Sequence, residues 1–228
     1  AHVAGSTLTV TYIFEDGSVY IEEKTPKKDF VSGSTQRIST TINRGDLCDY
    51  KLQVLTFEDE GGKHVFRHTA SHILAQAVKR LYPATKLTIG PAIENGFYYD
   101  FDMEHRLSME DLAAIEDEMK KIVKENLRIE RFELPRDEAI ALMTESEEPY
   151  KVQLIEELPE GETISFYRQG EYVDLCAGPH LYATGAVKAF KLTQCTGAYW
   201  KGDQSNKMLQ RVYGIAFPDK SALNEHLT

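Results

Sequence analysis

The strongest constraint on the fold of this chain is a helical pattern over residues 66–82, which Pro83 ends. His68 and His72 are four residues apart in this helix, so their side chains lie one above the other. They fall roughly opposite an apolar face whose side chains lie within about 70° of one direction. That face consists of Ala70, Ile73, Leu74, Ala77, Val78 and Leu81. The histidine pair is therefore predicted to line either a solvated surface or one wall of a cleft, and not the core.

Strand patterns on both sides of this helix predict an α+β fold with an antiparallel sheet and helices. Strands are predicted at 8–14, 18–22, 50–57, 96–101, 163–167, 171–175, 187–192 and 209–215, with a hairpin turn at Asp16-Gly17. Ser108 and Asp111 form a capping-box pattern that begins a helix running to about residue 127. Further helices are predicted at 135–144 and 220–227. Residues 58–63 are acidic and contain glycine, which predicts a linker between domains of residues 1–60 and 61–228.

Composition narrows the class of function. The 228 residues carry a net charge of −10, a poor overall signature for a nucleic-acid binder, because phosphate contacts need Lys and Arg. Residues 176–228 carry six basic and three acidic side chains, which indicates either a local basic surface or scattered surface charge. Three cysteines without a CxxC pair favour a reducing compartment. No apolar run of about 18 residues and no signal-peptide pattern is visible, so we expect a cytoplasmic protein without membrane contact.

A second chemical signal follows the predicted strand at 171–175. Side chains alternate along a strand, so Asp174 and Cys176 are expected on the same side. Gly178-Pro179 then turns the chain and returns His180 toward Cys176. The plainer interpretation is a buried structural cysteine beside an ordinary turn.

Taken together, the two segments offer four candidate zinc ligands: His68, His72, Cys176 and His180. The same groups could instead form a hydrolytic cluster that positions a water molecule. A third interpretation makes Cys176 a nucleophile with a histidine base. The sequence has no Gly-rich phosphate loop, so ATP binding has no support.

Four motifs resemble bacterial threonyl-tRNA synthetases. They are His68-Thr69-Ala70-Ser71-His72, the stretch from Ile89-Gly90-Pro91 to Asn95-Gly96-Phe97-Tyr98-Tyr99-Asp100, the loop Asp174-Leu175-Cys176-Ala177-Gly178-Pro179-His180, and Gly197-Ala198-Tyr199-Trp200-Lys201-Gly202-Asp203. The resemblance covers about residues 50–228 and implies the family's editing domain, which is related to that of alanyl-tRNA synthetases and to free-standing alanyl editing proteins. Residues 1–60 resemble the small β-grasp-like, ubiquitin-like TGS domain, but a polar stretch at 24–41 stands where that domain has a short helix.

The resemblance implies an aminoacyl-tRNA ester hydrolase that removes serine from tRNA specific for threonine. The matching catalytic positions are His68, His72, Lys151, Cys176 and His180, and the substrate-binding positions are Tyr99 and Asp174. His68 or Lys151 would orient or deprotonate a water, Asp174 would bind the substrate ammonium, and Tyr99 would line the pocket. The aminoacylation domain, normally in the same polypeptide, is expected to lie outside this chain.

The resemblance also bears on cofactors and alternatives. We expect that no metal is required, although zinc is possible at the four candidate ligands, as in the alanyl relatives. The alternatives are a zinc-held tRNA-binding module without catalysis, a free-standing trans-editing protein, and a regulatory domain with a degenerate pocket. The intact set of matching residues argues against degeneracy.

Overall fold

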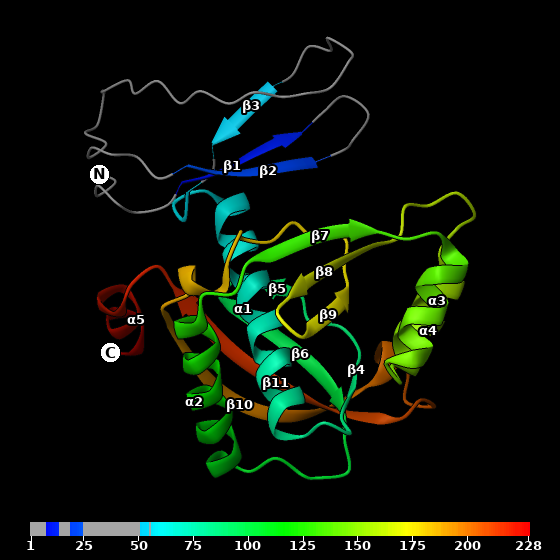
Figure 1. The fold of residues 1–228 in the computed structure, drawn as a ribbon. Helices are drawn as coiled ribbons and strands as arrows, with labels where there is room; N and C mark the ends of the chain where they lie inside the picture. Colours follow the sequence, from blue (N-terminus) through cyan, green and yellow to red (C-terminus); the bar gives the residue numbers. More distant parts are fainter. Residues whose placement is uncertain (1–7, 14–18, 25–50, 55) are drawn as a thin grey trace. The chain divides into compact units, whose positions relative to one another are not determined.

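The computed structural model describes residues 8–13, 19–24, 51–54 and 56–228, and it divides the chain into two units, Ala1–Lys63 and His64–Thr228 (Figure 1). In the first unit β1 (Leu8–Ile13) pairs antiparallel with both β2 (Val19–Lys24) and β3 (Lys51–Val54). The three expected strands are confirmed, with β3 shorter than expected. The Asp16-Gly17 turn and the polar stretch at 24–41 lie outside the described residues, so the TGS-like fold stays a prediction.

The second unit combines two antiparallel sheets with helices, which confirms the α+β class. The larger sheet has the order β10-β11-β6-β4 with β5 paired to β6. Its strands are β4 (Lys86–Leu87), β5 (Ala92–Ile93), β6 (Gly96–Asp102), β10 (Ala189–Tyr199) and β11 (Met208–Phe217). The smaller sheet has the order β7-β8-β9, formed by β7 (Ile129–Glu133), β8 (Ser165–Gln169) and β9 (Tyr172–Leu175). The sequence patterns missed β4, β5 and β7 and underestimated the length of β10.

The helix α1 (Glu60–Leu81) begins six residues earlier than its pattern indicated, so residues 60–63 are helical, and the boundary between the two units lies after Lys63. Its start is fixed by Asp59, whose carboxylate accepts from the backbone N and the hydroxyl of Thr56. A Cβ at Gly62 would lie 1.8 Å from the Thr56 carbonyl oxygen, so only glycine allows this close approach. Gly62, one of the glycines that suggested a linker, therefore permits the first turn of the helix.

The middle of α1 is buried on nearly every side, which corrects the expectation of a single core face. Residues 69–78 are all buried, including the polar Thr69, Ser71, His72 and Gln76. Each polar side chain except His72 is matched by a direct hydrogen bond: Ser71 Oγ donates to the Gly90 carbonyl, and Gln76 Nε2 donates to Glu171 Oε1. Leu81, predicted on the apolar face, is 39% exposed. In Figure 1, α1 crosses the centre of the second unit.

The remaining helices surround this centre. The predicted capping box opens α2 (Met109–Glu125), with Ser108 and Asp111 bonded reciprocally, and its apolar face is buried as expected. The helix α3 (Arg136–Glu145) follows Pro135 as predicted, and α5 (Lys220–Leu227) is confirmed. The sequence patterns missed α4 (Pro149–Glu157) and the short 3₁₀ turns η1 (Thr184–Ala186) and η2 (Trp200–Gly202). No helix among the described residues is long and apolar enough to cross a membrane.

Candidate functional site

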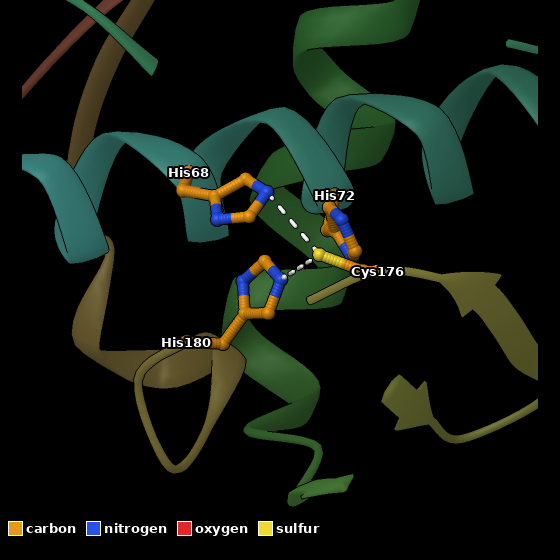
Figure 2. A group of neighbouring side chains, drawn as sticks. All are labelled: His68, His72, Cys176 and His180. Carbon is orange, nitrogen blue, oxygen red and sulfur yellow. Dashed lines mark hydrogen bonds between the residues drawn. The ribbon is translucent and has the colours of Figure 1, made fainter. Parts of the chain in front are cut away.

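Two segments far apart in sequence bring four donor side chains together (Figure 2). His68 and His72 project from α1, and Cys176 and His180 come from the loop after β9. One ligand atom from each residue lies within 4.8 Å of the others. Cys176 Sγ is 3.4 Å from His68 Nε2 and 3.2 Å from His180 Nε2, the two contacts drawn as dashed lines in Figure 2. The convergence expected from the two local spacings is therefore present.

The loop that carries Cys176 and His180 is shaped by its contacts with β8. Cys176 N donates to the Ser165 carbonyl at 3.0 Å, and Ser165 Oγ donates to the Cys176 carbonyl at 2.7 Å. Gly178 has a φ of +74°, and a Cβ there would lie 2.0 Å from the hydroxyl oxygen of Tyr167. Both facts require glycine at this position. The tight turn lets Gly178 N donate to Cys176 Sγ at 3.2 Å.

A second group of side chains, centred on Asp174, lies beside the four donors. Lys151 Nζ is 2.6 Å from Asp174 Oδ1. The hydroxyls of Tyr99 and Tyr172 donate to Asp174 Oδ2 at 2.7 and 2.8 Å. His72 Nε2 is 3.6 Å from that same Oδ2 atom, which links the Asp174 group to the four donors.

Burial separates the predicted site residues into two kinds. Tyr99, Asp174, Lys151, His72 and His180 are at most 3% exposed. His68 and Cys176 are partly exposed, so the cluster meets solvent on their side. Asp174 and Tyr99, the two expected substrate-binding residues, are both buried, and the Tyr99 hydroxyl donates to Asp174. A substrate ammonium would have to displace Lys151 or a tyrosine hydroxyl from Asp174.

Lys151 reaches Asp174 because the start of α4 is anchored. Glu148, the residue before α4, is 4% exposed, and its carboxylate accepts from Lys79 Nζ and from the backbone N of Leu87, each at 2.7 Å. The Glu148 carbonyl accepts the backbone N–H of Lys151 at 3.1 Å. The anchor therefore ties the first turn of α4 to α1 and β4, and Lys151 lies in that turn.

Thr69, Tyr172 and Glu148 contact the site but were not among the predicted site residues. Tyr172 precedes Asp174 by two residues in a strand, so the alternation rule that placed Cys176 beside Asp174 also applies to it. Thr69 lies inside the His68–His72 motif, but its residue type gave no sequence signal of a role in the site. Glu148 gave no local signal, because its partners Lys79 and Leu87 are distant in the sequence.

The environment keeps the four donors uncharged at neutral pH. Burial, and then the neighbouring His64, lower the pKa of His68 to about 4. Burial also holds the pKa values of His72 and His180 well below the ordinary range, and neighbouring histidines act in the same direction. Burial, and then the Asp174 carboxylate, raise the pKa of the Cys176 thiol to about 12. Three neutral imidazoles thus surround a protonated thiol.

The donor set also suits a metal such as zinc. Three imidazoles and one sulfur are common zinc ligands, and all four lie close enough to share one ion. His72 Nδ1 is buried and has no hydrogen-bond partner among the described residues, as expected of an atom free to bind a ligand. The Lys151 ammonium would repel a dication, but it is paired with the Asp174 carboxylate at 2.6 Å, which offsets that repulsion.

Comparison with known proteins shows what this chain is similar to. Residues 164–213, which include Asp174, Cys176 and His180, match the family described as the threonyl and alanyl tRNA synthetase second additional domain. Over most of its length the chain is also similar to proteins named threonine–tRNA ligase. It is 66% identical to that of Acetivibrio thermocellus over 198 residues, covering 87% of this chain and 31% of the relative. It is 61% identical to that of Clostridium tetani over 197 residues, which cover 86% of this chain and 30% of that relative.

The expected family resemblance is therefore confirmed. The chain is similar to part of threonyl-tRNA synthetases, and its residues 164–213 match the second additional domain. It spans about three tenths of the length of the curated relatives that it matches.

Proposed function

We propose that the cluster is the post-transfer editing site of a threonyl-tRNA synthetase, at which seryl-tRNA specific for threonine is hydrolysed to serine and free tRNA. The observation that carries the proposal is the partly open group of His68, His72, Cys176 and His180 beside the Lys151–Asp174 ion pair. It lies in a chain similar to threonine–tRNA ligases. The partner is then tRNA, the compartment is the cytoplasm, and the aminoacylation domain belongs to the same polypeptide.

An aminoacyl ester is already activated, so hydrolysis needs a held water, a proton acceptor and stabilisation of the carbonyl oxygen. His68 is the partly exposed histidine of the cluster, and its lowered pKa keeps it neutral and able to accept a proton. The Lys151 ammonium supplies positive charge for the developing oxyanion or orients the water. Asp174 holds Lys151 and Tyr99 in place.

Cys176 acts as a hydrogen-bonding group in this proposal and not as a nucleophile. A thiol whose pKa is about 12 has a negligible thiolate fraction at neutral pH, and the thiolate is the reactive form. No metal is required for the water-based reaction. A bound zinc ion, held by the same four residues, would supply a Lewis acid for the carbonyl or the water.

Serine is the chemically reasonable target for a second site in a threonine enzyme. A pocket that prefers one extra methyl group gains only about 1–3 kcal/mol, so the synthetic site cannot reject the smaller serine well. A second site can exclude threonine by its size. The largely buried walls of this cluster are suited to such exclusion, because close-packed side chains yield little to an added methyl group.

The test is release of amino acid from seryl-tRNA and threonyl-tRNA, both specific for threonine, by the 228-residue chain. We expect rapid release of serine and slow release of threonine. His68→Ala should slow serine release by roughly 10²-fold, the usual scale for a general acid–base group. The matched control is His226→Ala, which removes an exposed histidine of α5. No serine release above buffer would refute the esterase, and zinc-dependent tRNA binding without release would favour a zinc-held binding module.

A further inference from the structure

Thr69 is a fully buried residue of α1 whose hydroxyl makes three contacts. The hydroxyl donates to the Val65 carbonyl at 2.8 Å, one turn back in the helix. It accepts the backbone N–H of Leu181 at 2.9 Å. Its third contact, at 3.3 Å, is Nδ1 of His180.

The direction of the third contact follows from the first two. A hydroxyl has one proton to donate and two lone pairs that accept. The Thr69 proton is committed to Val65, the shorter of its two possible acceptor contacts, and one lone pair is committed to Leu181. The remaining lone pair can only accept, so the proton in the contact with His180 belongs to Nδ1. We infer that Thr69 fixes His180 in the tautomer protonated at Nδ1, with the Nε2 lone pair turned toward Cys176.

This tautomer also sets the direction of the next hydrogen bond. His180 Nε2 is 3.2 Å from Cys176 Sγ and carries no proton, so the thiol donates to it. The sulfur then accepts from Gly178 N at 3.2 Å. The Cys176 thiol therefore donates to His180, and His180 donates to Thr69. The Thr69 hydroxyl in turn donates to the Val65 carbonyl of α1.

Thr69 acts as a positioning residue in this arrangement. It holds the His180 ring and, through Leu181, the backbone on which His180 lies. The lone pair that His180 presents to the cluster can accept a proton or bind a cation, so the inference does not depend on whether metal is bound. Its effect on hydrolysis rests on the proposed function, but the tautomer itself does not.

The test is ¹H–¹⁵N correlation spectroscopy of histidine-labelled protein, dialysed against a chelator and measured at neutral pH. His180→Asn serves only to assign the His180 signals. We expect a protonated Nδ1 and an unprotonated Nε2 in the wild type and in Thr69→Ser, which keeps the hydroxyl. Thr69→Val keeps the shape of the side chain but removes the acceptor, so His180 should lose its preference for the tautomer protonated at Nδ1. A wild-type His180 protonated at Nε2 overturns the inference, and this spectrum decides even if Thr69→Val does not fold.

A matched control separates the tautomer from a general effect on the helix. Thr144 Oγ1 donates to the Ile140 carbonyl of α3 at 2.8 Å in the same way, but lies outside the cluster. Thr144→Val should leave the His180 signals unchanged. Thr69→Val with an unchanged tautomer would also overturn the inference.

Hydrolysis of seryl-tRNA provides a second readout. Thr69→Val should lower kcat about 10-fold, the lower end of the usual cost of removing a partner of a site histidine, and Thr69→Ser should restore it. If the wild type shows the expected tautomer but no hydrolysis, the proposed function fails and the role of Thr69 stands. If the wild type hydrolyses seryl-tRNA with His180 protonated at Nε2, the role of Thr69 fails and the proposed function stands.

Discussion

The buried ion pair between Lys151 and Asp174 makes a quantitative prediction for stability and activity. Their side chains are 4% and 1% exposed, and the charged atoms lie 2.6 Å apart. Removing one partner of a buried pair usually costs about 3–5 kcal/mol, because the other charge stays buried alone. In Lys151→Met the two tyrosine hydroxyls still donate to Asp174 Oδ2, so only Oδ1 loses its partner. We therefore expect the free energy of unfolding to fall by about 3 kcal/mol, the low end of that range.

The double variant Lys151→Met/Asp174→Asn isolates the interaction. Asp174→Asn alone leaves the ammonium buried without its partner and should also cost about 3 kcal/mol. With both charges removed no group is left uncompensated, so the double variant should lose about 3 kcal/mol or less, far below the sum of the single losses. Hydrolysis of seryl-tRNA should stay impaired in all three variants, because Lys151 or its support is missing in each.

Urea unfolding followed by the fluorescence of Trp200 measures these free energies. Trp200 is the single tryptophan of the chain, and its ring lies 5.0 Å from that of Tyr150, next to Lys151. It reports on the unit from His64 to Thr228. Single variants that each lose less than about 1 kcal/mol, or a double variant that loses the full sum, would refute the reasoning from an uncompensated buried charge.

Three further predictions concern the surroundings of the site. Lys79→Met leaves the Glu148 carboxylate buried without its cation, so we expect the free energy of unfolding in urea to fall by about 2 kcal/mol. Hydrolysis should also slow, because Lys151 is displaced; unchanged kinetics would exclude this anchor. Arg80 lowers the pKa of Glu171 to about 2. The stability from the Arg80–Glu171 ion pair is therefore present at neutral pH and lost as the pH falls from about 4.5 toward 2. Arg80→Met should therefore be about 1 kcal/mol less stable than the wild type at pH 7, with a difference that closes in acid; a constant difference contradicts this. Protein purified without added metal should keep its hydrolytic activity after chelation, whereas stoichiometric zinc with activity lost on chelation would show that metal is needed.

The four donors of the cluster could be predicted from the sequence because each pair is local. His68 and His72 are one turn apart, and Cys176 and His180 are joined by a Gly-Pro turn. Lys151 and Tyr99 gave no such signal, since their contacts with Asp174 join α4 and β6 to β9. They came from the family resemblance alone. Local spacing thus predicts pairs within a segment, and the contacts between segments depend on the whole fold.

The errors in predicting the fold from the sequence have the same origin. The periodicity of α1 placed His72 opposite the core, but tertiary hydrogen bonds to Gly90 and Glu171 allow polar side chains on that side to be buried. Gly62 looked like part of a linker because its role depends on the nearby Thr56 carbonyl. In both cases a contact outside the helix overrides the intrinsic preference of the residue.

The glycine in the Ile89-Gly90-Pro91 stretch limits how this site can change through mutation. A Cβ at Gly90 would lie 2.0 Å from the ring of Tyr99, whose hydroxyl donates to Asp174. Any larger residue at position 90 therefore requires a smaller one at position 99, and that change removes a donor from the carboxylate that holds Lys151. Neither substitution is neutral alone, and the pair together still weakens the site. Sequence drift at these two positions is consequently blocked in single steps, so the lineage of this domain should retain both residues for as long as the site is under selection.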